Sequence, residues 1–271
     1  MKKFLALMLA VMMCVAFAGC TASESDRKVS IAAKTSTLSA EITKEYAAKY
    51  GFDIAYYEDS PTMYQAVMNG TNDACYEDRS VIGWAIKESG LNLRTVGEIE
   101  RPAEYGFAVK KGTNPELIAM FNAGLANIKA SGEYDEILAK YGYLENPCKD
   151  ESAARVESGV KPTKKYVIYS DNAFAPFEYL DINTNQYVGV DMDILAAVAK
   201  DQGFEYVVKN EGFDAAMGAV QAGQADGMIA GMTITDERRE NFDFSDGYFE
   251  DGQILVVPAD SNITSIEDFA K

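Results

Sequence analysis

The sequence predicts an α/β protein of two lobes, each a mostly parallel sheet flanked by helices. Two regions begin with the same order of strand, polar loop and helix, one at Val29 and the other at Tyr166. Both regions then contain the pattern A-V-x-x-G-x-x-D, at residues 66–73 and 219–226. Single strands that alternate with helices are typical of parallel sheets, and ligands bind beyond the carboxyl ends of such strands. Generic α/β sequence is the alternative explanation of the repeat.

The elements of the first region follow from periodicity and from its turns. Residues 29–33 alternate as a strand does, and a polar turn separates them from a helical pattern over 38–50. The glycine of the repeated pattern ends the next helix, because glycine adopts the left-handed conformation at little cost. The apolar strand that follows delivers the polar residues 77–80, and its counterpart in the second region delivers 231–233.

Between the two units, the sequence predicts two packed helices and a linker. Asn114 and Pro115 suit the N-cap and first position of a helix. An apolar stripe at helical spacing follows and indicates packing; it consists of Leu117, Phe121, Leu125 and Ile128. A second helix is expected over 134–141, and another, after the second opening strand, over 191–202. Residues 144–164 lose periodicity and contain Pro147 and Pro162, which is typical of a linker.

The first nineteen residues have the form of a signal peptide. Lys2 and Lys3 precede an apolar run that is short for a membrane span, and small residues stand before Cys20. Residues 17–20 resemble the bacterial lipobox, which implies a lipid on Cys20 and a polar tether over 20–27. Ordinary cleavage that leaves a free cysteine is the alternative.

Composition argues against several classes of function. The formal net charge is −17, and removal of Lys2 and Lys3 leaves 23 basic residues against 42 acidic ones, about −19. Nucleic acid is therefore an improbable partner, since its binding relies on basic residues. The absence of histidine weakens a zinc or Ser-His catalytic hypothesis, and no metal or other cofactor is expected. Cys75 and Cys148 do not make a disulfide framework, and Cys75 is expected unpaired in an apolar strand.

The segment Ala230–Arg238 is the strongest candidate site. It leaves an apolar strand, and the Gly231 backbone, the Thr233 hydroxyl and the Arg238 guanidinium are suited to bind one carboxylate together. The alternative is a helix N-cap at Thr235 followed by a solvated arginine.

Two motifs carry a family resemblance. Residues 171–178 (DNAFAPFE) and 230–248 resemble the polar amino acid solute-binding proteins of ABC importers, which have the periplasmic binding protein type 2 fold; the glutamine-binding branch is most similar. The similarity covers 28–143 and 165–271. It implies an exported, lipid-anchored monomer that binds a polar amino acid, glutamine or arginine first, and delivers it to an ABC importer permease. An extracellular sensor, or a dehydratase using Glu77 or Asp78 as general acid, is the alternative.

The resemblance also implies a role for each site residue. The ligand carboxylate binds the segment with Ala230, Gly231, Thr233 and Arg238, and the ammonium binds Asp78. Phe174 and Phe213 sandwich the apolar portion, Asp171 and Lys34 contact the side chain, and Thr37 and Leu38 complete the pocket. Glu77 stands where the glutamine-binding branch has histidine. Two departures affect specificity: Leu38 narrows the pocket, and Glu77 adds an anion that favours a cationic or amide side chain. Lys34 opposes that trend, and either charge is alternatively solvated at the cleft rim.

The order of the lobes differs from the family pattern and indicates a circular permutation. Residues 28–100 with 261–271 form lobe 2, residues 101–143 with 165–260 form lobe 1, and 144–164 joins the former ends. Lobe 1 receives the ligand, and lobe 2 closes on it about strands near 101–105 and 256–260. Exposed links and adjacent ends make permutation tolerable. A domain-swapped dimer is the alternative.

Overall fold

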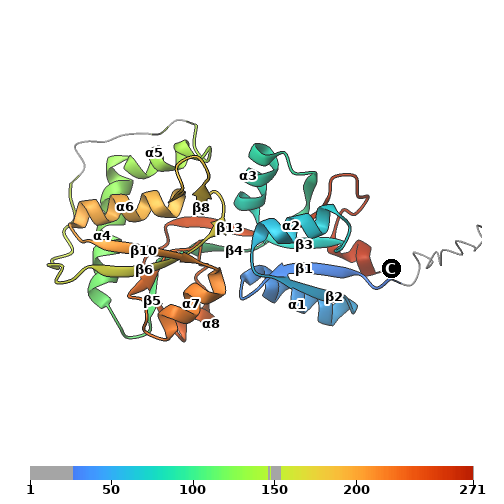
Figure 1. The fold of residues 1–271 in the computed structure, drawn as a ribbon, viewed down its shortest axis with the longest axis horizontal. Coiled ribbons are helices and arrows are strands. Elements are labelled where there is room, and N and C mark those ends of the chain that lie inside the picture. Colours follow the sequence, from blue (N-terminus) through green and yellow to red (C-terminus); the bar gives the residue numbers. More distant parts are fainter. Residues whose placement is uncertain (1–26, 146, 148–153, 271) are drawn as a thin grey trace, which may run out of the picture.

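The computed structural model describes residues 27–145, 147 and 154–270, which form two α/β lobes (Figure 1). The predicted two-lobed α/β fold is therefore confirmed. The expected signal peptide, the lipid site Cys20 and Cys148 lie outside the described residues. Within the described part, Cys75 is buried in a strand and unpaired, as expected. No helix in these ranges is long and apolar enough to cross a membrane.

Lobe 2 is built on a five-stranded sheet in the order β2-β1-β3-β13-β4. Strands β1, β2 and β3 run parallel, and β13 and β4 are antiparallel to their neighbours. The strands are β1 Ser30–Lys34, β2 Asp53–Tyr57, β3 Ala74–Asp78, β4 Leu93–Tyr105 and β13 Phe249–Pro258. The helices are α1 Leu38–Tyr50, α2 Ser60–Met68, α3 Arg79–Ser89 and the 3-10 helix η2 Ile266–Ala270.

Lobe 1 contains a second five-stranded sheet, in the order β10-β6-β11-β5-β12, and a small sheet β7-β8-β9. Its main strands are β5 Ala108–Lys110, β6 Tyr166–Asp171, β10 Tyr206–Glu211, β11 Gly227–Met228 and β12 Phe242–Phe244. The small sheet consists of β7 Ala173–Phe174, β8 Glu178–Asp181 and β9 Gln186–Val188. The helices are α4 Pro115–Ser131, α5 Glu133–Lys140, α6 Val190–Gln202, α7 Phe213–Gln221 and α8 Asp236–Arg239.

The core of lobe 1 forms where the sequence predicts it. All four residues of the α4 stripe are buried, and α4 packs against α6, which spans the helix expected over 191–202. The described end of the expected linker, from residue 154, has no helix or strand, but it docks on these two helices. The Asn127 side chain on α4 bonds both the N–H and the carbonyl of Val156.

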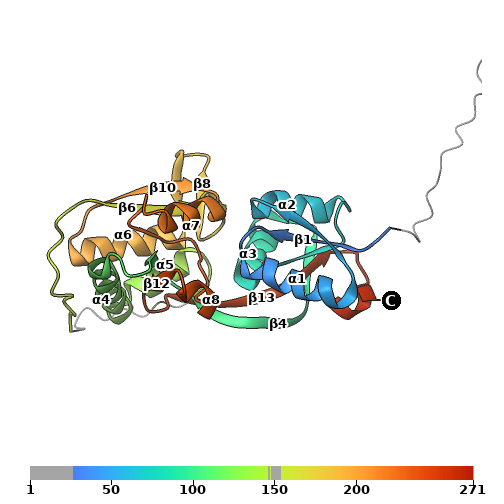
Figure 2. The ribbon, with the colours of Figure 1, turned by 90° about the horizontal axis from the view of Figure 1, so that it is seen from below.

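Two long strands, β4 and β13, connect the lobes and lie side by side along their whole length (Figure 2). Next to lobe 1, residues 103–105 pair with 249–251; at the far end, Leu93 pairs with Pro258. The expected crossing at 101–105 thus faces 249–251 and not 256–260, because β13 continues through the sheet of lobe 2, where residues 253–256 pair with β3. We therefore propose to move the lobe boundary from residue 260 to near Asp251.

Gly189, the N-cap of α6, allows this helix to pack closely against the segment Phe174–Glu178, which contains the predicted site residue Phe174. Gly189 has a φ of 140°, and a Cβ atom there would lie 2.0 Å from the carbonyl oxygen of Phe177. The N–H of Val190 donates to Pro176 at 2.9 Å, so α6 and the Phe174–Glu178 segment are joined at this point.

We expect Gly189→Ala to lower the free energy of unfolding by more than about 2 kcal/mol, because both the backbone conformation and the close contact exclude a side chain. Urea denaturation followed by circular dichroism measures this loss. Gly203→Ala is the matched control at the other end of α6: its φ is 73°, but no atom lies within 4 Å of the added Cβ, so only the backbone term of about 1 kcal/mol applies. Equal losses at the two positions would contradict the role of Gly189.

Candidate functional site

Ten of the twelve predicted site residues line one cavity between the lobes. Lobe 2 contributes Lys34, Thr37, Leu38 and Asp78, and lobe 1 contributes Phe174, Phe213, Ala230, Gly231, Thr233 and Arg238. Lys34 and Asp78 end the parallel strands β1 and β3, and Ala230 and Gly231 follow β11, which runs parallel to β6. The cavity therefore lies at the carboxyl ends of strands from both sheets, where α/β proteins bind ligands.

Arg238 is buried and reaches both lobes. Its Nη1 donates to the carbonyl of Thr233 at 2.8 Å, and its Nη2 donates to the carbonyl of Ser36, in lobe 2, at 3.0 Å. Thr235 is the N-cap of α8 and accepts the backbone N–H of Arg238 at 3.1 Å. The N-cap interpretation is thus correct, but its solvated arginine is not: Arg238 is 8% exposed, and burial lowers its pKa.

The loop before Arg238 is bound through its backbone to a buried acid on α6, Asp191. Gly231 has a φ of 52°, and an added Cβ would lie 2.5 Å from the Phe174 ring. Its N–H donates to Asp191 Oδ2 at 2.8 Å, and the hydroxyl of Tyr248 donates to the same oxygen at 2.8 Å. The loop therefore has one defined position against α6.

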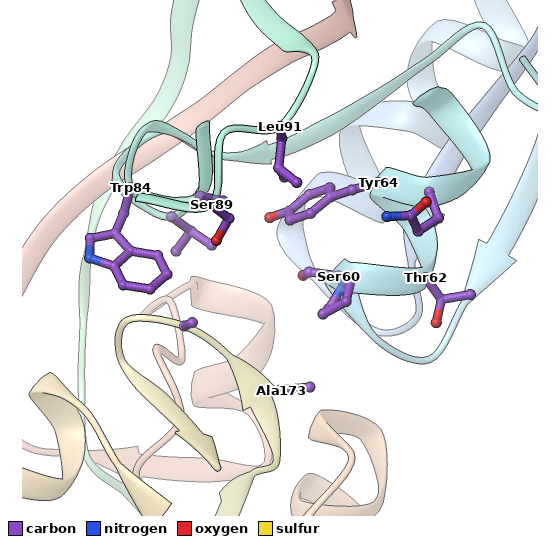
Figure 3. Close-up of a pocket in the computed structure, with 12 residues that line it drawn as sticks. Ser60, Thr62, Tyr64, Trp84, Ser89, Leu91 and Ala173 are labelled. Atoms are coloured by element: carbon purple, nitrogen blue, oxygen red, sulfur yellow. The ribbon is translucent and has the colours of Figure 1, made fainter. Parts of the chain in front are cut away.

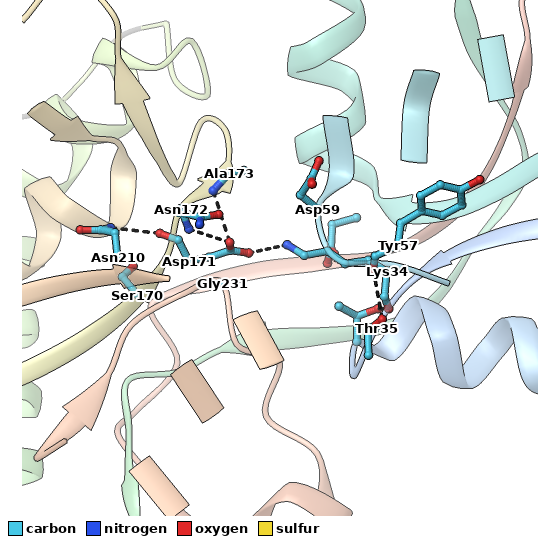
Figure 4. Close-up of polar contacts among 12 residues, drawn as sticks. Lys34, Thr35, Tyr57, Asp59, Ser170, Asp171, Asn172, Ala173, Asn210 and Gly231 are labelled. Atoms are coloured by element: carbon cyan, nitrogen blue, oxygen red, sulfur yellow. Dashed lines mark hydrogen bonds and ion pairs between the residues drawn. The ribbon is translucent and has the colours of Figure 1, made fainter. Parts of the chain in front are cut away.

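Lys34 and Asp171 form a buried ion pair that joins the two lobes (Figure 4). The Lys34 Nζ also lies 4.6 Å from the centroid of the Phe174 ring and 5.8 Å from that of Phe213. Burial alone would lower the pKa of Lys34, but the charge and hydrogen bond of Asp171, together with the charges of Glu77 and Glu178, outweigh it, so this pKa is raised. The lysine ammonium thus lies close to both aromatic rings, and the cavity that these residues line has a volume of about 20 Å³.

Thr37 and Leu38 shape the lobe 2 wall of the cavity. Thr37 is the N-cap of α1, and its side chain accepts the backbone N–H of Ala40. Leu38 is the first residue of the helix and is buried against the cavity. The turn before them also contacts lobe 1, since the Ser36 hydroxyl donates to Asp214 at 2.5 Å.

Glu77 lies behind the cavity wall and does not line it. Its Oε2 accepts the Tyr64 hydroxyl at 2.7 Å, and its Oε1 accepts the backbone N–H of Asp78 at 3.0 Å. Glu77 is 1% exposed and Lys34 is 2% exposed, so the alternative in which either is solvated at the cleft rim is wrong. Both charges are committed to partners inside the protein.

A second cavity, of about 360 Å³, lies between α2 and α3 on one side and the β7 region on the other (Figure 3). Tyr64, Val81, Trp84 and Leu91 form its apolar walls, and Ala173 faces them from lobe 1. None of its lining residues is charged. It is therefore poorly suited to the charged ends of an amino acid, whereas charged side chains, Lys34, Asp78 and Arg238, line the smaller cavity. In the described ranges, no group of three or more acids or cysteines could hold a metal ion.

Sequence reasoning missed four residues that support the site: Glu178, Asp191, Tyr105 and Gln253. Asp191 holds Gly231, while Tyr105 and Gln253 both donate to Asp78. Glu178 is fully buried beside Asp191, and no N–H group in the described part of the chain donates to either of its carboxyl oxygens. The one feature of the sequence that could have indicated Glu178 is its position directly after the apolar run Phe174–Phe177.

A two-lobed α/β protein with a polar cavity between its lobes belongs to the class of ligand-binding proteins. The sequence model of bacterial extracellular solute-binding proteins, family 3, matches residues 12–143 and 166–270. The chain therefore belongs to this family, as its motifs indicate, and the family works outside the cytoplasm.

Three relatives show the range of ligands among similar proteins. A protein of Neisseria gonorrhoeae named "Probable histidine-binding protein" is 40% identical over 41% of this chain and 41% of its own length. The arginine-binding extracellular protein ArtP of Bacillus subtilis is 36% identical over 41% of this chain and 43% of its own. The glutamine-binding protein GlnH of Bacillus subtilis is 34% identical over 45% of each chain. The chain thus spans less than half the length of the curated relatives it matches.

The buried carboxyl of Glu178 makes stability depend on pH. Burial, and then the charge of Asp191, raise the pKa of Glu178 well above its ordinary value of 4.5. Above about pH 4.5 the folded state consequently binds more protons than the unfolded state, and stability falls as the pH rises toward the folded pKa.

We expect Glu178→Gln to remove this part of the slope, because an amide stays neutral. The variant should match the wild type near pH 4.5 and exceed its unfolding free energy by about 1 kcal/mol or more at pH 7. Chemical denaturation at the two pH values measures the difference, with the exposed Glu205→Gln as control. A variant that is less stable at pH 7 would show that Glu178 is needed as an anion.

Proposed function

We propose that the protein binds a polar amino acid between its lobes and delivers it to the permease of an ABC importer, while a lipid on Cys20 anchors it to the outer face of the membrane. One observation carries the proposal: ten residues from both lobes, with Arg238 and Asp78 among them, line a single cavity. Arg238 offers paired donors for a carboxylate, and Asp78 offers an acceptor for an ammonium.

Binding begins on lobe 1 and ends with closure of lobe 2. Phe174, Phe213 and Arg238 lie on lobe 1, and Lys34, Thr37 and Asp78 come from lobe 2. A cavity of about 20 Å³ is too small for an amino acid, so the lobes must turn apart about β4 and β13 to admit one. Closure is then favoured by the contacts that lobe 2 adds to the ligand.

The side-chain end of the pocket favours an amide. Lys34 supplies a donor and Asp171 supplies an acceptor, and an amide group needs one of each. A cationic side chain would meet the lysine charge, and an acidic one would meet the aspartate. We therefore place glutamine first. Arginine stays second, because its guanidinium could pair with Asp171 although the Lys34 charge opposes it. We propose a receptor in preference to a sensor or an enzyme.

A thermal-shift screen against the twenty amino acids tests the proposal. We expect glutamine to raise the melting temperature in a concentration-dependent way, because it binds only the folded state. Arg238→Ala should weaken this binding by more than about 2 kcal/mol, through loss of a buried charged hydrogen bond. Calorimetry measures the loss, with Arg239→Ala, on the same helix, as control. A wild type that responds to none of the twenty would refute amino acid binding.

We also propose that one chain forms both lobes in permuted order. The start and end of the described chain support this, because Val29, Ile266 and Phe269 share one apolar cluster in lobe 2. The described part of the linker, from residue 154, likewise leads along α4 and α6 to β6. Size-exclusion chromatography with light scattering should give the mass of one chain for protein that binds ligand. A ligand-binding species with the mass of two chains would favour the domain-swapped dimer.

A further inference from the structure

The carboxylate of Asp78 is held by both strands that connect the lobes. Its Oδ1 accepts the hydroxyl of Tyr105, on β4, at 2.6 Å and the side-chain N–H of Gln253, on β13, at 2.7 Å. All three side chains are buried. The place of Asp78 in the cavity therefore depends on the place of β4 and β13.

A second contact fixes the chain just after Asp78 to the same strands. The carboxylate of Asp251, on β13, accepts the backbone N–H of Ser80 at 3.1 Å and also the Ser80 hydroxyl. The hydroxyl of Tyr105 lies 3.3 Å from Asp251 Oδ2. Residues 78–80 are thus tied to the connecting strands at two points, and Tyr105 stands between them.

The geometry leaves one oxygen of Asp78 for a ligand. Both donors use Oδ1, and among the described residues no group donates to Oδ2, so this oxygen remains for a further donor; Asp78 also lines the cavity. Of the two polar groups of the Gln253 amide, the N–H group is the one that is bonded. The amide oxygen is buried and has no hydrogen-bond partner in the described part of the chain. An unpaired buried oxygen is costly, which makes this side chain a poor choice for packing alone.

The donors also act on the charge of Asp78. Burial raises its pKa well above the ordinary value, and the charges of Glu77 and Asp251 raise it further. The hydrogen bonds from Tyr105 and Gln253 act in the opposite direction and favour the ionised form. An ammonium group is bound by the ionised form.

We infer that Tyr105 and Gln253 are positioning residues for the ligand ammonium: through Oδ1 of Asp78 they aim Oδ2 into the cavity. Recognition of the ammonium is in this way coupled to the two strands about which the lobes turn. The inference rests on the proposed function, since it assumes a ligand with an α-ammonium.

The test compares L-glutamine with 4-carbamoylbutanoic acid, the same molecule without its amino group. Calorimetry should show that Tyr105→Phe weakens glutamine binding about tenfold, as expected for a hydrogen bond to a charged group. Binding of the deaminated analogue should change less than about twofold, because it does not use Asp78. Gln253→Met should give the same pattern with a loss of about threefold, and serves if Tyr105→Phe does not fold.

The pH profile gives a second readout. Loss of a donor raises the pKa of Asp78, so as the pH is lowered the glutamine affinity of Tyr105→Phe should begin to fall at a higher pH than that of the wild type. Tyr76→Phe is the matched control: it also loses a buried tyrosine hydroxyl, which donates to Glu100 at 2.8 Å away from the cavity.

The outcomes distinguish a positioning role of Tyr105 and Gln253 from a general structural role. Equal losses for glutamine and the analogue would mean a general structural role for Tyr105 and would overturn the inference, as would unchanged glutamine affinity in both variants. A wild type that binds none of the twenty amino acids overturns the proposed function, and the inference with it; if another amino acid binds in place of glutamine, the same comparison is made with that amino acid and its deaminated analogue.

Discussion

The antiparallel pairing of β4 with β13 is the constraint on which the rest of the structure depends. These two strands belong to the sheet of lobe 2 and also lead into lobe 1, so every contact across the cavity is set by their course. Register shifts interrupt their pairing between Asp251 and Leu255. A backbone irregularity at this point allows the β4–β13 pair to twist while the hydrogen bonds between the two strands on either side are kept. The residues that hold Asp78 lie within or beside this stretch.

Charge balance is the second constraint on the cavity. Lys34, Asp171, Asp78 and Arg238 are all buried, and a buried charge without a partner is very costly. In the closed arrangement Lys34 neutralises Asp171, while Arg238 is satisfied by backbone carbonyls of both lobes. These contacts stabilise closure without a ligand. The ligand that we propose must therefore offer better partners than the protein gives itself. A zwitterion with an amide side chain would supply three such groups: a carboxylate, an ammonium and an amide.

Much of this organisation could be read from the sequence, because it depends on local patterns. The A-V-x-x-G-x-x-D repeat placed equivalent strands in both lobes, and the Ala230–Arg238 segment placed the arginine. The course of β13 could not be read in this way, since its apolar run is equally compatible with either sheet and only pairing with β3 assigns it. Glu77 was misjudged for a related reason: its burial depends on Tyr64, thirteen residues earlier on another element.

Large separations along the sequence explain why the residues that support the site could not be predicted. Tyr105, Gln253 and Asp191 lie 27, 175 and 40 residues from the atoms they hold, so no spacing rule connects them with the site. The role of Tyr105 and Gln253 can be recognised only when β4 and β13, from distant parts of the chain, are paired. The same reasoning bears on the permuted order that we propose. A cavity defined by contacts across β4 and β13 needs both strands at fixed positions, but it does not need them in any particular order along the chain. Strand pairing, and not chain order, therefore determines whether the site can form.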